Sequence, residues 1–215
     1  MALDRPDLVD PVELSQRLIR CPSVTPEEGG ALDELQVVLE KIGFRCTRLV
    51  FSESGTPDVD NLYARIGKTG PNFCFAGHSD VVPPGQSSEW SGDPFSGIIA
   101  DGKLFGRGSS DMKSAIAAFV AAAERFIKEG FNKREFSISL LITGDEEGPA
   151  INGTNKVLEW MKENKLALER GIKGEIAEDF ITGLKSLFKE HYIDVPEEKY
   201  NVLEDLTNQG KDLEA

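Results

Sequence analysis

The stretch FSISLLITG, residues 136–144, constrains the fold more strongly than any other part of the sequence. Its β-branched and aliphatic residues form a nearly continuous apolar run, which is typical of a strand that is buried on both faces. A strand of this kind needs a layer of other elements on each side of its sheet. The stretch therefore predicts a layered fold in which helices cover a central sheet.

Segments with helical periodicity surround this strand. Apolar residues recur at helical spacing in several of them, and one segment is rich in alanine, a strong helix former. The predicted helices span residues 10–20, 30–42, 110–129 and 153–164. Shorter strand-like runs occupy residues 44–51, 61–67 and 72–77. We therefore expect an α/β fold with a mixed, mostly parallel sheet flanked by helices, followed by an α-helical tail.

Length and charge narrow the class of protein. At 215 residues, the chain is long enough for one or two domains with a sizeable core. Its net charge of −13, with no basic stripe, argues against nucleic acid as a partner. No apolar run approaches the ~20 residues that cross a bilayer, and the acidic N-terminus is unlike a signal peptide. Cys21, Cys46 and Cys74 lack CxxC spacing, so we expect reduced, buried thiols in a cytoplasmic protein that does not bind membranes.

Polar side chains with metal-binding chemistry follow two of the predicted strands. His78, one of only two histidines, follows the run at 72–77, and the acidic residues 145–147 follow the run at 136–144. In sheets of this class, ligands bind beyond the carboxyl ends of the strands. We therefore expect these side chains to converge on one cleft at that edge of the sheet.

His78, Asp111 and Glu147 offer imidazole and carboxylate groups, a ligand set that suits zinc or a related divalent ion. A carboxylate can also bridge two metal ions, as two-metal hydrolases require. Asp111 ends the glycine-rich turn GRGSSD and opens the alanine-rich helix. A carboxylate at a helix N-terminus also interacts favourably with the helix dipole, so a role for Asp111 as a cap stays open.

Asp80 and Glu146 lie beside two of these candidate ligands. Asp80 can accept the second ring N–H of His78 and fix its tautomer, although Asp80 also fits a simple polar loop. Glu146 can take a proton from water while Glu147 binds metal, although the DEEG segment also fits a solvated acidic turn. The sequence has neither a GxSxG nor a GxxxxGK[ST] pattern, which argues against an acyl-serine mechanism and a P-loop.

Several long motifs lie within residues 10–163: LIRCPSVTPEEGG, GHSDVVPPG, DPFSG, DGKLFGRGSSDMKS and TGDEEGPAINGT. These residues closely resemble the succinyl-diaminopimelate desuccinylases, which belong to the dinuclear zinc peptidase/aminoacylase superfamily. VTPEEGG and VVPPG are more similar to this branch than to general aminoacylases or carboxypeptidases. The resemblance implies hydrolysis of the amide of N-succinyl-LL-2,6-diaminopimelate to succinate and LL-2,6-diaminopimelate, on the route to lysine and peptidoglycan.

The same resemblance implies a role for each candidate residue. His78 matches a histidine that binds one zinc ion, Asp80 matches the acidic partner that orients it, and Asp111 matches an aspartate that bridges two metal ions. Glu146 matches the general base, and Glu147 matches a ligand of the second ion. The implied cofactor is zinc, two ions per site, or cobalt, and the implied partner is a small succinylated diamino acid.

The chain departs from the family pattern in three respects. A GEPT-like segment with a further metal-binding carboxylate is not found, the segment around His191 does not match the family's second metal-binding histidine, and the dimerisation domain of the homodimeric family is missing. We therefore expect residues 1–163 to be the N-terminal portion of a metallohydrolase catalytic domain, with weak or absent hydrolysis.

Residues 164–215 differ in character and predict a helical tail, with apolar residues at helical spacing between Ile172 and Phe188. The tail loosely resembles the prohead core scaffolding proteins of large tailed phages, which implies a junction of unrelated segments near residues 162–165. The alternative function is a catalytically inactive fragment or fusion whose tail binds another protein. A third interpretation is a helical cap over the sheet surface.

Overall fold

The structure, a computed structural model, describes residues 8–68 and 71–166, and every structural statement below refers to these residues. In chain order, the elements are α1 (Pro11–Ile19), α2 (Ala31–Lys41), β1 (Arg45–Phe51), β2 (Val59–Ile66), β3 (Asn72–His78), the short helical turn η1 (Ser87–Glu89), β4 (Ile98–Ala100), β5 (Lys103–Phe105), the irregular turn η2 (Ser109–Lys113), α3 (Ser114–Lys128), β6 (Ser137–Thr143) and α4 (Thr154–Glu163).

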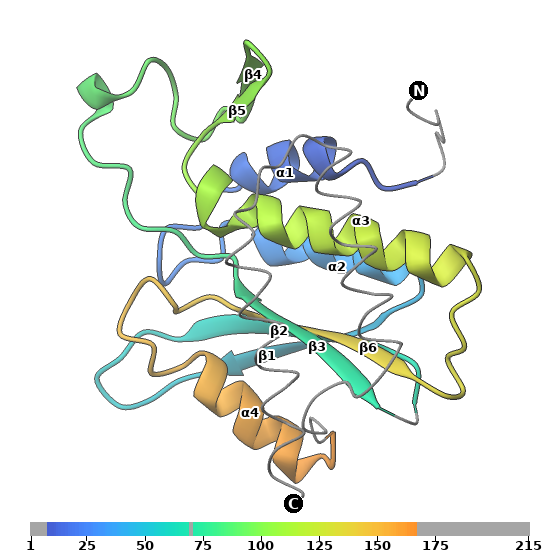
Figure 1. Cartoon of the computed structure of the whole chain (residues 1–215). Helices are drawn as coiled ribbons and strands as arrows, with labels where there is room; N and C mark the ends of the chain where they lie inside the picture. Colours follow the sequence, from blue (N-terminus) through green and yellow to red (C-terminus); the bar gives the residue numbers. More distant parts are fainter. Residues whose placement is uncertain (1–7, 69–70, 167–215) are drawn as a thin grey trace, which may run out of the picture.

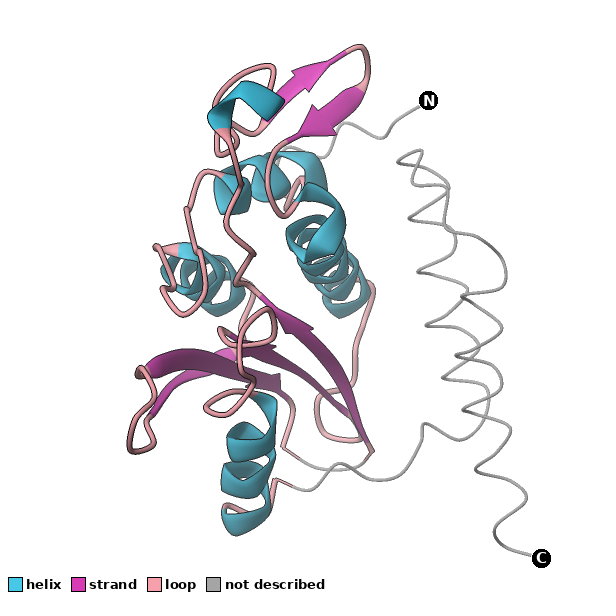
Figure 2. Ribbon diagram, turned by 90° about the vertical axis from the view of Figure 1, so that its left-hand side faces the viewer, coloured by secondary structure: helices cyan, strands magenta, loops and turns pink. Residues whose placement is uncertain are grey.

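A four-stranded sheet in the order β1-β2-β6-β3 forms the middle layer. Helices α1, α2 and α3 cover one face of the sheet, and α4 lies against the other, as Figures 1 and 2 show. The small β4–β5 hairpin projects from the body of the molecule beyond α1 (Figure 1). The expected mixed sheet flanked by helices is therefore confirmed.

Strand β6 is buried at every position, because each face of the sheet has its own apolar cluster. Leu140 belongs to the larger cluster, beneath α1, α2 and α3, and is fully buried. Leu141, the next residue, belongs to the smaller cluster with Val157 and Met161 of α4. Successive side chains of a strand point to opposite faces, so a strand between two helical layers is apolar throughout. This arrangement accounts for the continuous apolar run at residues 136–144.

The sheet is mixed because β2 runs opposite to the other three strands, so two of the three strand pairings are antiparallel. Strands β1 and β2 pair antiparallel, as do β2 and β6, and only β3 and β6 pair in parallel. The short loop between β1 and β2 makes these two strands antiparallel. The parallel neighbours β3 and β6 need a longer crossover connection. Only one helix, α3, lies between two consecutive strands of this sheet, β3 and β6.

The predicted helices and strands are otherwise present within a few residues, with two local differences. The alanine-rich helix becomes regular only at Ser114, because Asp111 and Met112 have non-helical backbone angles. The β4–β5 hairpin was not predicted, because its strands are three residues each and largely exposed, so they leave no periodic pattern.

Three further expectations concern the rest of the chain. Cys21, Cys46 and Cys74 form no disulfide, as expected, but they are half-buried rather than buried. In the described part of the chain, every helix is too short or too polar to span a membrane. The predicted tail from Ile172 to Phe188, and with it His191, lies outside the described residues.

Candidate metal centre

The candidate site lies where the parallel strands β3 and β6 end together. His78, the last residue of β3, is paired with Thr143, the last residue of β6. The acidic turn after β6 therefore begins beside His78, which is 5% exposed. The structure thus brings the two predicted groups of polar residues to one edge of the sheet.

The ring of His78 is held from both of its nitrogens. Nδ1 donates to the backbone carbonyl oxygen of Asp80 at 3.0 Å, and a carbonyl oxygen can only accept. In the neutral ring, Nε2 therefore carries the lone pair. Asp111 Oδ1 lies 3.0 Å from Nε2, and Glu146 Oε2 lies 3.6 Å from it. A lone pair and two carboxylates thus converge on one point, where a cation would satisfy all three.

His78, Glu146 and Glu147 together form a compact group of possible metal ligands. One ligand atom from each residue lies within 4.8 Å of the other two. Asp111 also contacts Nε2 of His78, and its side chain is 72% exposed. Nitrogen and oxygen donors of this kind suit a divalent metal ion such as zinc. The residues present therefore fit the metal that the sequence predicted.

Asp80 faces both the imidazole and the backbone of the acidic turn. Its carboxylate is nearly fully buried and accepts hydrogen bonds from the backbone N–H groups of Glu146, at 3.3 Å, and Glu147, at 2.9 Å. The carboxylate also faces the imidazole as expected, with Oδ1 3.6 Å from Nδ1, while the carbonyl oxygen of Asp80 lies nearer, at 3.0 Å. Asp80 thus ties the acidic turn after β6 to the end of β3.

Asp145, the first acidic residue of that turn, is not one of the grouped ligands. Asp145 is buried, and its carboxylate accepts a hydrogen bond from the backbone N–H of Asn152 at 3.0 Å. It therefore shapes the chain that leads into α4. Of residues 145–147, only the last two join the site.

Asp111 reaches His78 because its backbone is extended rather than helical. The N-cap residue of α3 is Lys113, which makes no capping bond through its side chain, so the structure gives no support to a capping role for Asp111. Met112 follows, and its Sδ accepts a hydrogen bond from the backbone N–H of His78 at 3.4 Å. Gly77 leaves room for Met112, since a Cβ at Gly77 would lie 2.9 Å from the Met112 methyl carbon.

Lys113 is a buried residue of the site region that sequence reasoning missed. It is 1% exposed, and its Nζ donates to the carbonyl oxygens of Leu18, at 2.8 Å, and Cys21, at 2.7 Å. It thus anchors the turn that carries Asp111 to the C-terminal end of α1. No signal in the sequence marks it, because a lysine beside a helix start is usually on the surface.

The electrostatics follow from burial and the gathered acids. Burial opposes protonation of His78, but hydrogen bonds to Asp80, the negative charge of Asp80 and the contact with Asp111 outweigh it and raise its pKa to about 9. Burial also raises the pKa of Glu147, and the charges of Asp111 and Glu146 add to this effect, whereas His78 acts against it. Without a metal ion, the imidazole therefore holds a proton in the place of the cation.

Curated relatives named succinyl-diaminopimelate desuccinylase align with most of this chain. The protein of Parvibaculum lavamentivorans is 60% identical over 166 residues, and that of Rhodospirillum centenum is 62% identical over 152 residues. These alignments cover 77% and 71% of this chain, but 41% and 39% of the relatives. The chain thus spans about two fifths of the length of these relatives.

Solved structures share the fold at lower identity. Human carnosine dipeptidase 1 matches with a TM-score of 0.61 and 23% identity, covering 71% of this chain and 35% of that one. An M20 family metallo-carboxypeptidase from Sulfolobus solfataricus matches with a TM-score of 0.59 and 22% identity, covering 74% and 35%. Both likenesses concern the arrangement of the sheet and its helices.

The sequence model of peptidase family M20/M25/M40 matches residues 74–198, more than half of the chain. This range contains all five candidate residues and continues past residue 163, so the expected boundary between residues 163 and 164 stays a prediction. The match to the family model and the identity with the curated relatives agree with the fold and the grouped ligands. The chain belongs to peptidase family M20/M25/M40.

Proposed function

We propose that this chain is the N-terminal catalytic portion of a metal-dependent amide hydrolase that acts on N-succinyl-LL-2,6-diaminopimelate. The observation that carries the proposal is the convergence of Asp111 and Glu146 on Nε2 of His78, beside Glu147. The names of relatives about 60% identical support the choice of substrate. The cytoplasmic location and a homodimer of the whole protein stay predictions.

His78, Asp111 and Glu147 are the proposed ligands, and zinc is the proposed ion, with cobalt as a substitute. The carboxylate of Asp111 has two oxygens, so it suits a bridge between two ions, which is the arrangement that the family resemblance implies. A bound divalent ion supplies a Lewis acid that polarises the amide carbonyl.

Glu146 is the proposed general base. Its carboxylate is 56% exposed, so it can reach both a water molecule and the scissile amide at the mouth of the site. It takes a proton from the attacking water and delivers it to the leaving amine. Asp80 is a positioning residue in this scheme, because its carboxylate fixes the backbone that carries Glu146 and Glu147.

Zinc titration of the metal-free chain tests the site directly. The chain has two histidines, so His78→Gln and His191→Gln form a matched pair that each removes one imidazole. We expect His78→Gln to weaken zinc binding by about 100-fold or more, beyond the loss typical of residues that only support a ligand. His191→Gln should bind zinc as the unchanged chain does. Zinc binding that is unchanged in His78→Gln would remove His78 from the site.

Release of succinate from N-succinyl-LL-2,6-diaminopimelate tests the chemistry. Because the described residues offer the metal one imidazole, we expect slow turnover that requires zinc. Glu146→Gln should lower the rate by about 100-fold or more while zinc binding persists, since only the base is removed. Turnover that is unchanged in Glu146→Gln, or that proceeds after chelation, would contradict the scheme. Zinc binding without any turnover would favour the alternative of an inactive fragment.

A further inference from the structure

A second concave site lies at the opposite end of the sheet from His78. It is a cavity of about 1200 Å³ between the start of β1, the end of β2, the loop before β6 and the end of α4. Because β2 runs antiparallel to β6, the end of β2 lies beside the start of β6. The cavity therefore extends along β2 from Ile66, opposite Ile138 at the start of β6, to Tyr63, opposite Leu141. None of its lining residues belongs to the candidate metal centre.

The cavity is lined by basic residues although the chain as a whole is acidic, with a net charge of −13. The basic residues that line it are Arg45, Arg65, Lys68, Lys133, Arg134 and Lys165. The described lining contains no aspartate or glutamate. Like charges around one hollow repel one another, and a negatively charged ligand beside Arg65, Lys68 and Lys133 would relieve that repulsion.

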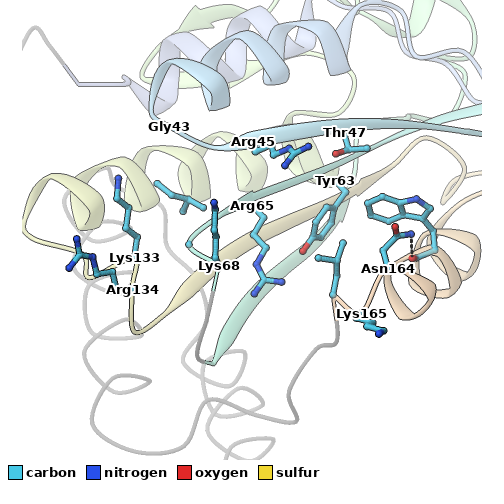
Figure 3. Close-up of a pocket in the computed structure, with 14 residues that line it drawn as sticks. Gly43, Arg45, Thr47, Tyr63, Arg65, Lys68, Lys133, Arg134, Asn164 and Lys165 are labelled. Carbon is cyan, nitrogen blue, oxygen red and sulfur yellow. Dashed lines mark hydrogen bonds between the residues drawn. The ribbon is translucent and has the colours of Figure 1, made fainter.

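Two buried donors in the cavity wall lack hydrogen-bond partners among the described residues. They are the hydroxyl of Tyr63, a side chain only 3% exposed, and Nε of Arg65. Figure 3 shows both side chains projecting from β2 into the cavity, with the Tyr63 hydroxyl turned toward Arg65. A buried donor without an acceptor loses the hydrogen bond it would make with water, so each of these groups favours a ligand that accepts.

The two side chains are held in place before any ligand arrives. One terminal nitrogen of Arg65 donates to Oγ of Ser137 at 2.8 Å, which fixes the guanidinium. The ring of Tyr63 packs edge-on against Trp160, with 5.6 Å between the ring centroids. Burial raises the pKa of the Tyr63 phenol, although nearby Ser139 and Arg65 partly offset this, so the phenol stays a donor at neutral pH. The wall is therefore a fixed set of donors and positive charges.

We propose that this cavity binds a small multivalent oxyanion, with Arg65 and Tyr63 donating to its oxygens and the surrounding lysines and arginines balancing its charge. Phosphate and carboxylate groups share this chemistry, since both present several acceptor oxygens to a guanidinium. The proposal does not depend on the proposed hydrolase function, because no residue is common to the two sites.

Pyrophosphate and citrate are suitable probes, titrated into the full chain at constant ionic strength by calorimetry. Trp160 lines the cavity, so its fluorescence in a Trp90→Phe background gives a second readout. The exposed pair Lys68→Gln and Lys133→Gln removes two charges from the cavity. The matched control is Lys103→Gln with Lys162→Gln, which removes two exposed lysines that do not line it.

We expect saturable binding of at least one probe, weakened about tenfold by the cavity pair and less than about twofold by the control pair. When Arg65→Met is added to the cavity pair, binding should weaken further, because this change removes the guanidinium and its fixed set of donors. Tighter binding of pyrophosphate assigns phosphate chemistry, and tighter binding of citrate assigns carboxylate chemistry. His78→Gln should leave both affinities unchanged, which separates this site from the metal centre.

Two results would overturn the proposal. One is the lack of saturable binding of either probe up to about 10 mM, a concentration at which even weak specific sites fill. The other is equal weakening by the cavity pair and the control pair, which would mean that net charge alone attracts the anion.

Discussion

At the scale of single residues, both ring nitrogens of His78 have polar neighbours. Its Nδ1 is committed to the carbonyl of Asp80, so Nε2 is the only ring atom left for a metal ion, and two carboxylates already approach that nitrogen. The proton that His78 binds below its pKa of about 9 occupies the same lone pair. Protons and metal ions therefore compete for one atom.

We predict a steep pH dependence of zinc binding from this competition. The pKa of His78 in the metal-free chain is about 9. The apparent affinity for zinc should therefore rise about tenfold per pH unit from pH 6 to 8 and level off above pH 9. Calorimetry in buffers of different ionisation enthalpy would count the protons released. Asp80→Asn removes a charge that raises this pKa, so it should move the plateau to lower pH. An affinity that is flat between pH 6 and 8 would refute the competition.

The three cysteines should be unreactive in the folded chain. Burial is the main cause that raises the pKa of each thiol, to about 12 for Cys46, so the reactive thiolate is scarce at pH 8. We expect iodoacetamide to label Cys46 at least about 100-fold more slowly in the folded chain than in urea. Mass spectrometry of digested samples would give the rate at each site, and similar rates in both states would contradict the prediction.

At this scale, sequence reasoning found the residues whose chemistry is unusual for their position. An imidazole directly after a buried strand, and a pair of glutamates after another, stand out from an apolar background. Lys113 and Met112 could not be found in this way, because their roles depend on contacts with α1 and β3 that are distant in sequence. The sequence does not distinguish Asp145 from Glu146 and Glu147, because its contact with the backbone of Asn152 depends on the geometry of the turn.

At the scale of elements, the turns on either side of the sheet edge form one connected unit. Asp80 joins the end of β3 to the turn after β6, and Lys113 joins the turn before α3 to the end of α1. The candidate ligands thus belong to different segments, but hydrogen bonds to backbone atoms fix those segments. A site built in this way depends on the packing of α1, α3 and β6 rather than on any single loop.

The turn after β2 offers a test of how tightly the elements fit. Gly67 and Gly55 both have positive φ, but a Cβ at Gly67 would lie 2.2 Å from the carbonyl oxygen of Phe136, whereas nothing lies within 4 Å of one at Gly55. We expect Gly55→Ala to lower the free energy of unfolding by about 1 kcal/mol, from backbone strain alone. Gly67→Ala should lower it by at least about 2 kcal/mol more.

Urea unfolding of the two variants without metal would measure the difference between them. Equal losses would mean that the loop after β2 moves away from Phe136 at little cost. The midpoints and slopes should be compared together, because a changed slope signals a changed unfolded state.

Most elements could be predicted because their residue types indicate which positions are buried, as in the largely apolar β6 and the alanine-rich α3. Strand direction could not, since β6 pairs with β2 in one sense and with β3 in the other, and no local pattern encodes a partner. The hairpin of β4 and β5 escaped prediction because Ile98, Ile99 and Phe105 are exposed rather than packed on a core.

At the scale of the whole molecule, the sheet separates two kinds of charge. Acidic side chains gather around His78 where β3 and β6 end, and basic side chains gather around the cavity where β6 begins. A cation at the first end and an anion at the second would each neutralise a cluster of like charges. Both ligands would therefore favour the folded chain over the unfolded one.

Zinc should stabilise the whole chain through this linkage. At about 100 times its dissociation constant, zinc should raise the free energy of unfolding by about 2.7 kcal/mol, because the unfolded chain no longer brings the ligands together. Urea unfolding with zinc and with a chelator would measure the gain. The gain should vanish in His78→Gln and persist in His191→Gln, and a gain of equal size in both variants would point to ions bound elsewhere.

The order β1-β2-β6-β3 also has a consequence for synthesis on the ribosome. The middle position beside β2 is filled by residues 137–143, which are translated after both of the strands they join. Until then, β1 and β2 can form only a two-stranded hairpin, which is marginally stable in water, and β3 has no neighbour. Until β6 is synthesised, three strands and the apolar sides of three helices therefore lack their final packing partner. Chaperones can bind these exposed apolar surfaces during that interval.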